Sequence, residues 1–207
     1  MSRPNRIPLF PLDVVLLPGM ALPLHIFEPR YKLMIGRCLE EKIEFGMILA
    51  SNNSLAATGC TAEIVRKIRD YPDGRMDIAT EGRAVFRLNE LLDERDYYEG
   101  LVEYVDDDPG RTDSAKRTRL VEAFEKCHEL LFGQPWAQGR GDAENTMAYR
   151  MAALLPIELE KRQTLLESRS EAHRRELVLG WMNELLPKLS ERERARNRAG
   201  GNGHRPH

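Results

Sequence analysis

The sequence predicts an α+β protein in which a β-rich part comes first and a helical part follows. Between residues 5 and 108, short apolar segments alternate with proline and glycine turns, a pattern typical of a small curved sheet. After residue 112 the apolar residues recur every three or four positions, which is the helical period. The acidic segment DDDPGRTDS lies between the two parts and indicates a linker. We therefore expect a β-rich domain at 5–108, a helical bundle at 112–188 and a disordered charged tail at 191–207.

The most hydrophobic stretch is PLFPLDVVLLPGMALPLHIFEPRY, residues 8–31. Its prolines, together with Asp13 and Glu28, exclude a membrane-spanning helix and the unbroken apolar core of a signal peptide. Proline also excludes one long helix, because it removes a backbone donor and disfavours helical geometry at the preceding residue. We expect three short strands instead, IPLF, VVLL and ALPLHIF, in a cytoplasmic protein that starts at its natural N-terminus.

The rest of the β-rich part alternates one helix with further strands. Pro29 is well placed in a first helical turn, and apolar residues then follow at helical spacing from Tyr31 to Leu39. FGMILAS (45–51) indicates a buried strand, and 59–92 a long hairpin turning at Pro72-Asp73-Gly74, with a bulge or tight bend at Gly82. YYEGLVEYV (97–105) closes this part.

The helical part shows separate apolar stripes. One stripe runs from Leu120 to Leu131 and is broken after Gly133, and a second runs from Met147 to Leu154. A short helix is expected at 157–167. Ser168-x-x-Glu171 has the spacing of a capping box for a last helix, which we expect Pro187 to end or kink.

The sequence contains no signature of a nucleotide-binding or hydrolytic enzyme. The phosphate loop G-x-x-x-x-G-K-[ST], G-x-G-x-x-G, H-E-x-x-H and G-x-S-x-G are all absent. Cys38, Cys60 and Cys127 are too far apart for a C-x-x-C metal knuckle, so we expect reduced, buried thiols. The net charge of −2 gives no general attraction to nucleic acid or anionic membranes. We predict no catalytic residue, no cofactor and no metal site.

Three local features have both a functional and a structural interpretation. Cys127-His128 combines a nucleophile with a base, but neighbouring residues on a helix do not face each other. Asp106-Asp107-Asp108 could hold a divalent cation, although a solvated linker is the commoner meaning. The arginines of 191–198 could contact RNA or acidic lipid, yet glutamates intervene and no aromatic residue offers base stacking. We expect a structural role for all three.

Two segments resemble the N-terminal, substrate-binding domain of ATP-dependent Lon proteases. In IPLFPLDVVLLPGMALPLHIFEPRYKLMI, the elements PLFPL, LLPG and LPLHIFEPRY follow in the order typical of that family. GCTAEIVRKIRDYPDGRMDIATEGRAVFRLNEL is similar to the long hairpin of the family, with Gly82 in the place of its glycine. The resemblance covers about residues 5–188 and implies a PUA-like β pseudo-barrel followed by a helical bundle.

Lon proteases continue into an ATPase and a Ser-Lys peptidase domain, whereas this sequence has no Walker motif. The resemblance therefore implies a stand-alone, non-enzymatic module that binds unfolded or tagged proteins, or an adaptor in proteolysis that works with a separate Lon protease. Shallow apolar grooves between barrel and bundle, or strand addition at an open sheet edge, would provide the binding. The candidate binding residues are Met20, Leu24, His25, Phe27, Arg30, Tyr31 and Met34.

Two other classes of function stay open. PUA-like barrels include RNA-binding proteins, and this alternative predicts an affinity that falls steeply with salt. A hydrolase with a site assembled from distant residues would need polar groups that converge in a deep pocket. The basic patch of the RNA-binding alternative would consist of Arg66, Lys67, Arg69, Arg83 and Arg87.

Overall fold

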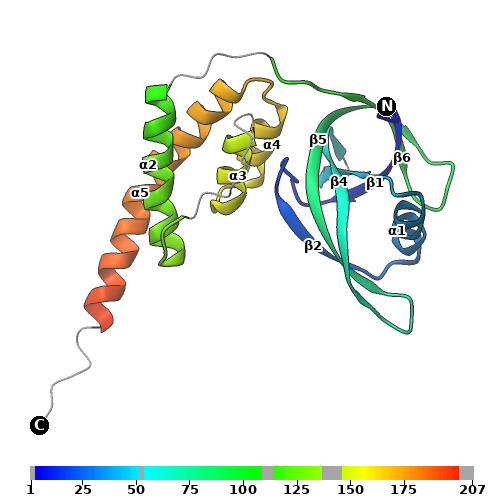
Figure 1. The fold of residues 1–207 in the computed structure, drawn as a ribbon, viewed down its shortest axis with the longest axis horizontal. Coiled ribbons are helices and arrows are strands. Elements are labelled where there is room, and N and C mark those ends of the chain that lie inside the picture. Colours follow the sequence, from blue (N-terminus) through cyan, green and yellow to red (C-terminus); the bar gives the residue numbers. More distant parts are fainter. Residues whose placement is uncertain (1–2, 52–53, 109–113, 137–145, 201–207) are drawn as a thin grey trace, which may run out of the picture. The chain divides into compact units, whose positions relative to one another are not determined.

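The computed structural model describes residues 3–51, 54–108, 114–136 and 146–200 (Figure 1). These residues form two compact units. Unit 1 contains the chain through Asp108 and takes in Glu158–Arg169 as well, whereas unit 2 contains the chain from Pro109 to Ile157 and from Ser170 onward.

Unit 1 is built on a mixed β-sheet. Its strands are β1 (Arg6–Leu12), β2 (Ala21–Ile26), β3 (Phe45–Ser51), β4 (Ser54–Asp70), β5 (Met76–Leu92) and β6 (Glu99–Tyr104). The six strands lie in the order β2-β5-β4-β3-β1-β6, and β5 also pairs with β6, so that the sheet closes on itself. Only β1 and β3 run parallel among these pairs. The predicted α+β class, with a barrel-like sheet and a long β4–β5 hairpin, is confirmed.

The core of unit 1 lies inside the closed sheet and under one helix. Ile7, Leu9, Ile48, Phe86 and Val102 form a buried cluster within the sheet. Burying each such side chain contributes about 1.5–3 kcal/mol to the free energy of unfolding. Helix α1 (Pro29–Glu41) begins at the predicted proline and turns its apolar stripe to the interior. The buried residues of that stripe are Tyr31, Met34, Ile35 and Cys38.

The segment between β1 and β2 differs from the prediction, because VVLL is not a strand. Val15, Leu16 and Leu17 are buried, and the segment docks on β5 just after them, through the amide of Gly19, which donates to the carbonyl of Gly82 at 2.8 Å. The amide of Gly82 donates in turn to the carbonyl of Met20 at 3.0 Å. The β4–β5 register slips beside Gly82, between the pairs Cys60–Val85 and Ala62–Gly82, so the irregularity predicted there is confirmed.

Unit 2 is helical. It contains α2 (Ser114–Phe132), α3 (Met147–Leu154) and α5 (Glu171–Gly200), and both α2 and α3 pack on α5. The buried side chains follow the predicted stripes, with Leu120 and Phe124 on α2 and Met151 on α3. Val178 and Met182 are their buried counterparts on α5.

Helix α4 (Leu159–Glu167) belongs to unit 1, although the sequence had placed it in the helical bundle. It packs on β4, where Gln163 Nε2 donates to the carbonyl of Thr58 at 3.1 Å. The two points at which the chain leaves unit 1 are joined, because the amide of Asp108 donates to the carbonyl of Arg169 at 2.7 Å. Hydrophobic spacing predicts a helix but not the surface on which it packs.

Helix α5 differs from its prediction at both ends. Ser170 caps it, with Oγ accepting from the His173 amide at 3.4 Å, while Ser168 ends α4. The helix passes through Pro187 and reaches Gly200, so the residues from Glu191 to Gly200 are helical where we expected disorder. Glutamate, arginine and alanine dominate this stretch and favour the helix on propensity alone. The remaining residues of the predicted tail, 201–207, lie outside the described part of the chain.

Candidate functional site

The end of β2 carries an exposed aromatic cluster. Phe27 follows β2 directly and is 58% exposed. Its ring stacks on the ring of His25, with centroids 5.9 Å apart and an interplanar angle of 22°. The His25 ring also meets Tyr71 edge-on at 5.8 Å, and Tyr71 lies at the turn of the β4–β5 hairpin. The cluster therefore joins the end of β2 to the end of the hairpin.

Asp77 on β5 organises the polar side of this cluster. Nδ1 of His25 lies 2.5 Å from Oδ1 of Asp77, and the Tyr71 hydroxyl donates to Oδ2 at 2.9 Å. These two hydrogen bonds, that of His25 first, lower the pKa of the Asp77 carboxyl below its ordinary value. The guanidinium groups of Arg69 and Arg75 lie 4.9 and 5.0 Å from the centre of the Tyr71 ring. The result is an ordered aromatic surface with cations around it.

Five of the predicted binding residues reach the surface and two do not. Tyr31 is 5% exposed and Met34 is fully buried. The Tyr31 ring packs on Phe10 with centroids 4.1 Å apart, so neither residue can line an open surface. Helical spacing turns both residues toward the sheet. His25, Phe27 and Arg30 are exposed, and Met20 and Leu24 are half-buried.

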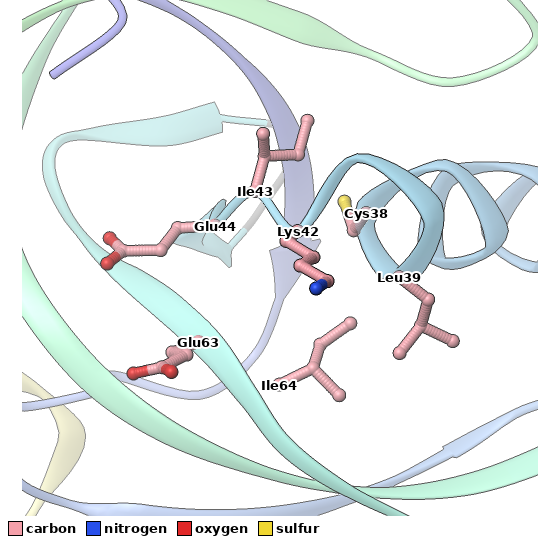
Figure 2. A pocket seen from close by; sticks show the side chains of 7 residues that line it. All are labelled: Cys38, Leu39, Lys42, Ile43, Glu44, Glu63 and Ile64. Atoms are coloured by element: carbon pink, nitrogen blue, oxygen red, sulfur yellow. The ribbon is translucent and has the colours of Figure 1, made fainter.

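A second feature of unit 1 is a hollow of about 400 Å³ beside α1 and β4 (Figure 2). Apolar and charged side chains alternate around it, and the thiol of Cys38 faces it from the helix (Figure 2). Burial raises the pKa of Cys38 to about 12, so the thiol is protonated at neutral pH and is no nucleophile. The lining residues are Cys38, Leu39, Lys42, Ile43, Glu44, Glu63 and Ile64.

No pattern in the sequence predicts this hollow. Its two walls come from the end of α1 and from β4, and no spacing rule connects these segments. The only related sequence pattern is the mixture of apolar and charged residues at 63–70. In the structure, this stretch is the part of β4 that continues past its neighbour β3.

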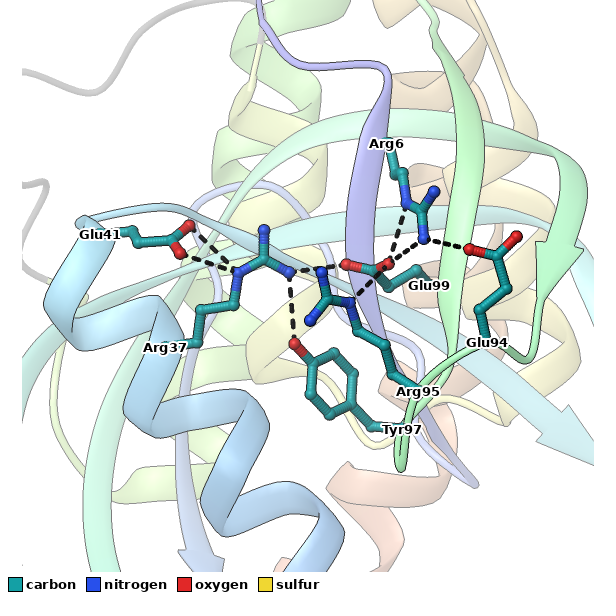
Figure 3. A network of polar contacts seen from close by, with 7 residues as sticks. All are labelled: Arg6, Arg37, Glu41, Glu94, Arg95, Tyr97 and Glu99. Atoms are coloured by element: carbon teal, nitrogen blue, oxygen red, sulfur yellow. Dashed lines mark hydrogen bonds and ion pairs between the residues drawn. The ribbon is translucent and has the colours of Figure 1, made fainter.

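An ion-pair network surrounds Glu99 of β6, which is 3% exposed (Figure 3). The Glu99 carboxylate forms three ion pairs, with nitrogen–oxygen distances of 2.5 Å to Arg6, 2.7 Å to Arg37 and 3.2 Å to Arg95. Burial by itself raises the pKa of Glu99, but the hydrogen bonds from Arg6 and Arg37 outweigh it and the pKa is lowered. A carboxylate held in this way stays ionised at neutral pH, and we assign it a structural role rather than acid–base chemistry.

The catalytic and metal-binding alternatives find no support in the described residues. Cys127 is buried, which raises its pKa to about 11, and Nδ1 of its neighbour His128 lies 3.0 Å from the carbonyl oxygen of Gln134. Asp108 forms an ion pair with Arg169 at 3.2 Å. Residues 3–51, 54–108, 114–136 and 146–200 hold no group of three or more side chains suited to a metal ion, and none of their helices is both long and apolar enough to cross a bilayer.

The basic patch considered for RNA binding is neutralised in part, at Arg83 and Lys67. Arg83 forms ion pairs with both Glu63 and Glu81, and Lys67 forms one with Asp70 at 3.1 Å. These internal pairs compete with any contact to phosphate groups, which supplies most of the affinity for nucleic acid.

Known proteins show what this chain is similar to. The family profile described as the ATP-dependent protease La (LON) substrate-binding domain matches residues 6–184. The Lon protease of Escherichia coli is 27% identical over 216 residues, which cover 95% of this chain and 27% of that protein. The Lon protease of Parabacteroides distasonis is 32% identical over 119 residues, which cover 53% of this chain and 14% of that protein. The chain thus spans only a minor part of these relatives.

Solved structures agree with this assignment. A Lon N-terminal domain protein from Xanthomonas campestris superposes with a TM-score of 0.69 at 26% identity, over 86% of this chain and 98% of that one. The N-terminal domain of a Lon protease from the Mycobacterium avium complex shares the fold, with a TM-score of 0.62 at 14% identity over 86% and 98% of the two chains. The chain belongs to the family of Lon substrate-binding domains.

Proposed function

We propose that this chain is a non-catalytic protein-binding module that holds exposed apolar segments of unfolded or tagged proteins. An adaptor of this kind would present its clients to a separate Lon protease. Membership of the Lon substrate-binding family supports the general role. The observation that carries the proposed binding surface is the exposed ring of Phe27, stacked on His25 at the end of β2.

The geometry of this surface suits an apolar client. The stacking contact with His25 orders the Phe27 ring before binding, so less side-chain entropy is lost when a client covers it. The other two apolar candidates lie farther along the chain: Leu24 is half-buried within β2, and Met20 is half-buried just before its start, where a methionine adapts to partners of different shape. Arg30 is exposed at the start of α1, shortly after Phe27 in the chain, and offers a cation for the polar groups of an extended segment.

The proposal is tested with Phe27→Ala. Binding of a reduced, carboxymethylated and permanently unfolded protein is measured by fluorescence anisotropy. We expect about tenfold weaker binding, because truncation of an aromatic anchor in an interface costs about 1–2 kcal/mol. Phe132→Ala on α2 is the matched control, since Phe132 is similarly exposed at 50%. Equal affinities of Phe27→Ala and the unmodified protein, or equal losses in both variants, would contradict the proposed surface.

A further inference from the structure

One edge of β4 is open over residues 63–70. Strand β3 pairs with β4 only between Ser54 and Ala62, whereas β5 accompanies β4 as far as Asp70. Beyond Ala62, no strand in the described part of the chain pairs with the other edge of β4. An edge of this kind presents backbone donors and acceptors that an added strand can use.

Helix α1 approaches this part of the molecule at two places, the start of the open edge and the hairpin turn beyond its end. At the start of the edge lies the hollow, where Glu63 and Ile64 of β4 line one wall and Cys38 of α1 lies in the opposite one (Figure 2). At the far end, Lys32 of α1 reaches the hairpin turn and donates from Nζ to the carbonyl of Asp73 at 3.0 Å. The open edge therefore begins at a ready-made depression and ends at a fixed contact.

The side chains along the edge combine exposed β-branched residues with surplus positive charge. Val65 is 56% exposed and Ile68 is 50% exposed. The two acidic residues of the stretch are neutralised within the protein, because Glu63 pairs with Arg83 and Asp70 with Lys67. Arg66 and Arg69 form no ion pair among the described residues, although Arg69, which lies over the Tyr71 ring, is close enough to Asp77 to help lower the pKa of that carboxyl.

We propose that the open edge of β4 binds an extended peptide by strand addition, and that the peptide carries β-branched residues with carboxylates opposite Arg66 and Arg69. This inference rests on the proposed function and gives it a binding mode and a preferred client chemistry. Backbone hydrogen bonds supply affinity in such complexes, and side chains supply selectivity. The carboxylates complement the surplus charge of the edge.

The same features disfavour a second copy of this chain as the occupant. Edge-to-edge pairing of two copies would bring the same cationic segment against itself, and like charges on neighbouring strands are destabilising. The β4–β5 register also slips twice along the edge, between Ile64 and Arg66 and between Lys67 and Arg69, and such bulges twist an edge away from indiscriminate pairing.

The test uses the full chain and a fluorescent peptide of about six residues, a usual strand length, that alternates valine and glutamate. Anisotropy gives its affinity, and amide hydrogen exchange read by mass spectrometry gives its location. We expect slower exchange at residues 63–70, and no binding by the same peptide with alternate amides methylated. Arg66→Glu is expected to weaken binding about tenfold. Arg87→Glu, an exposed arginine on β5, makes the same change of net charge and should bind like the unmodified protein.

Several results would overturn the inference. One is that the peptide slows amide exchange only outside residues 63–70. Another is that a peptide that alternates valine and lysine binds with the same affinity as the valine–glutamate peptide. A third is that the Arg66→Glu and Arg87→Glu variants lose equal amounts of affinity for the peptide. Protection of 63–70 that grows with protein concentration in the absence of peptide would identify a second copy as the occupant instead. If the peptide fails while unfolded protein still binds in a Phe27-dependent way, this inference fails and the proposed function stands. If Phe27→Ala does not change the binding of unfolded protein while the peptide slows exchange at residues 63–70, the β4 edge is supported as a binding site and the Phe27 surface is contradicted.

Discussion

Gly82 shows how a single residue positions the segment that precedes β2. A Cβ atom at this position would lie 2.2 Å from the carbonyl oxygen of Leu17, a backbone atom that cannot move aside alone. The absence of a side chain allows the 13–20 segment to dock on β5 through the two hydrogen bonds between Gly82 and the residues Gly19 and Met20. This docking places Met20 immediately ahead of β2.

Gly82→Ala is therefore expected to destabilise the protein by about 2–3 kcal/mol, the cost of forcing an extra methyl group into a closed contact. Urea unfolding followed by circular dichroism measures the change. Gly36→Ala is the control, because a Cβ there meets nothing within 4 Å and the residue lies within α1. That variant should be neutral or gain up to about 1 kcal/mol from helix propensity. A tolerated Gly82→Ala would show that the segment is not held as described.

At the scale of elements, Glu99 fastens three parts of unit 1 together. Arg6 belongs to β1, Arg37 to α1 and Glu99 to β6, while Arg95 comes from the loop before β6 (Figure 3). Removing one partner from such a buried set leaves the others desolvated and unpaired. The arginines are partly exposed, which reduces the cost relative to a wholly buried pair.

We predict that Glu99→Gln lowers the free energy of unfolding at pH 7 by on the order of 2 kcal/mol. The folded-state pKa of Glu99 lies below its ordinary value of 4.5, so its contribution is present above that pH and is lost as pH falls through the lowered value. The difference between the variant and the unmodified protein should accordingly shrink on acidification. Denaturant titrations between neutral and acid pH measure it.

Glu41→Gln is the control for this prediction, because Glu41 pairs with the same arginine, Arg37, but is half exposed. It should cost less than about 1 kcal/mol. A Glu99→Gln variant that is as stable as Glu41→Gln, or whose deficit grows in acid, would contradict the assigned role.

Elements with a strong local signal were predictable from sequence. The strand 45–51 follows from its apolar run, the start of α1 from Pro29, and the hairpin from Pro72-Asp73-Gly74. The strand predicted at VVLL was wrong because strand pairing depends on a neighbour, and the segment is held instead by the bonds of Gly19 and Met20 to Gly82 of β5. The extension of α5 was missed because Pro187 and the charged composition both argued against a helix there.

The candidate site was only partly predictable for a related reason. The stretch 20–34 holds both its exposed and its buried apolar residues, and sequence alone does not separate Phe27 from Tyr31 and Met34. The contacts of His25 with Tyr71 and Asp77 join residues that lie far apart in the sequence. Pairing of β2 with β5 brings them together, and that pairing has no local signature.

At the scale of the whole molecule, the two surfaces proposed for binding lie in unit 1, one at the end of β2 and one along β4. Both adjoin the β4–β5 hairpin, whose turn residue Tyr71 contacts His25 and whose carbonyl at Asp73 receives Lys32. Unit 2 also exposes large apolar side chains, Phe132 and Leu154, which lie outside both proposed surfaces. A map of the residues that a bound client protects, measured over both units, therefore distinguishes the proposed surfaces of unit 1 from the exposed apolar side chains of unit 2.

The most direct test of the central claim is amide hydrogen exchange of the intact protein with and without a saturating amount of reduced, carboxymethylated protein. The proposed function predicts slower exchange in residues 20–30, around the exposed ring of Phe27, with the helices of unit 2 unchanged. Protection confined to α2, α3 and α5, or saturated binding that leaves residues 20–30 unprotected, would contradict it.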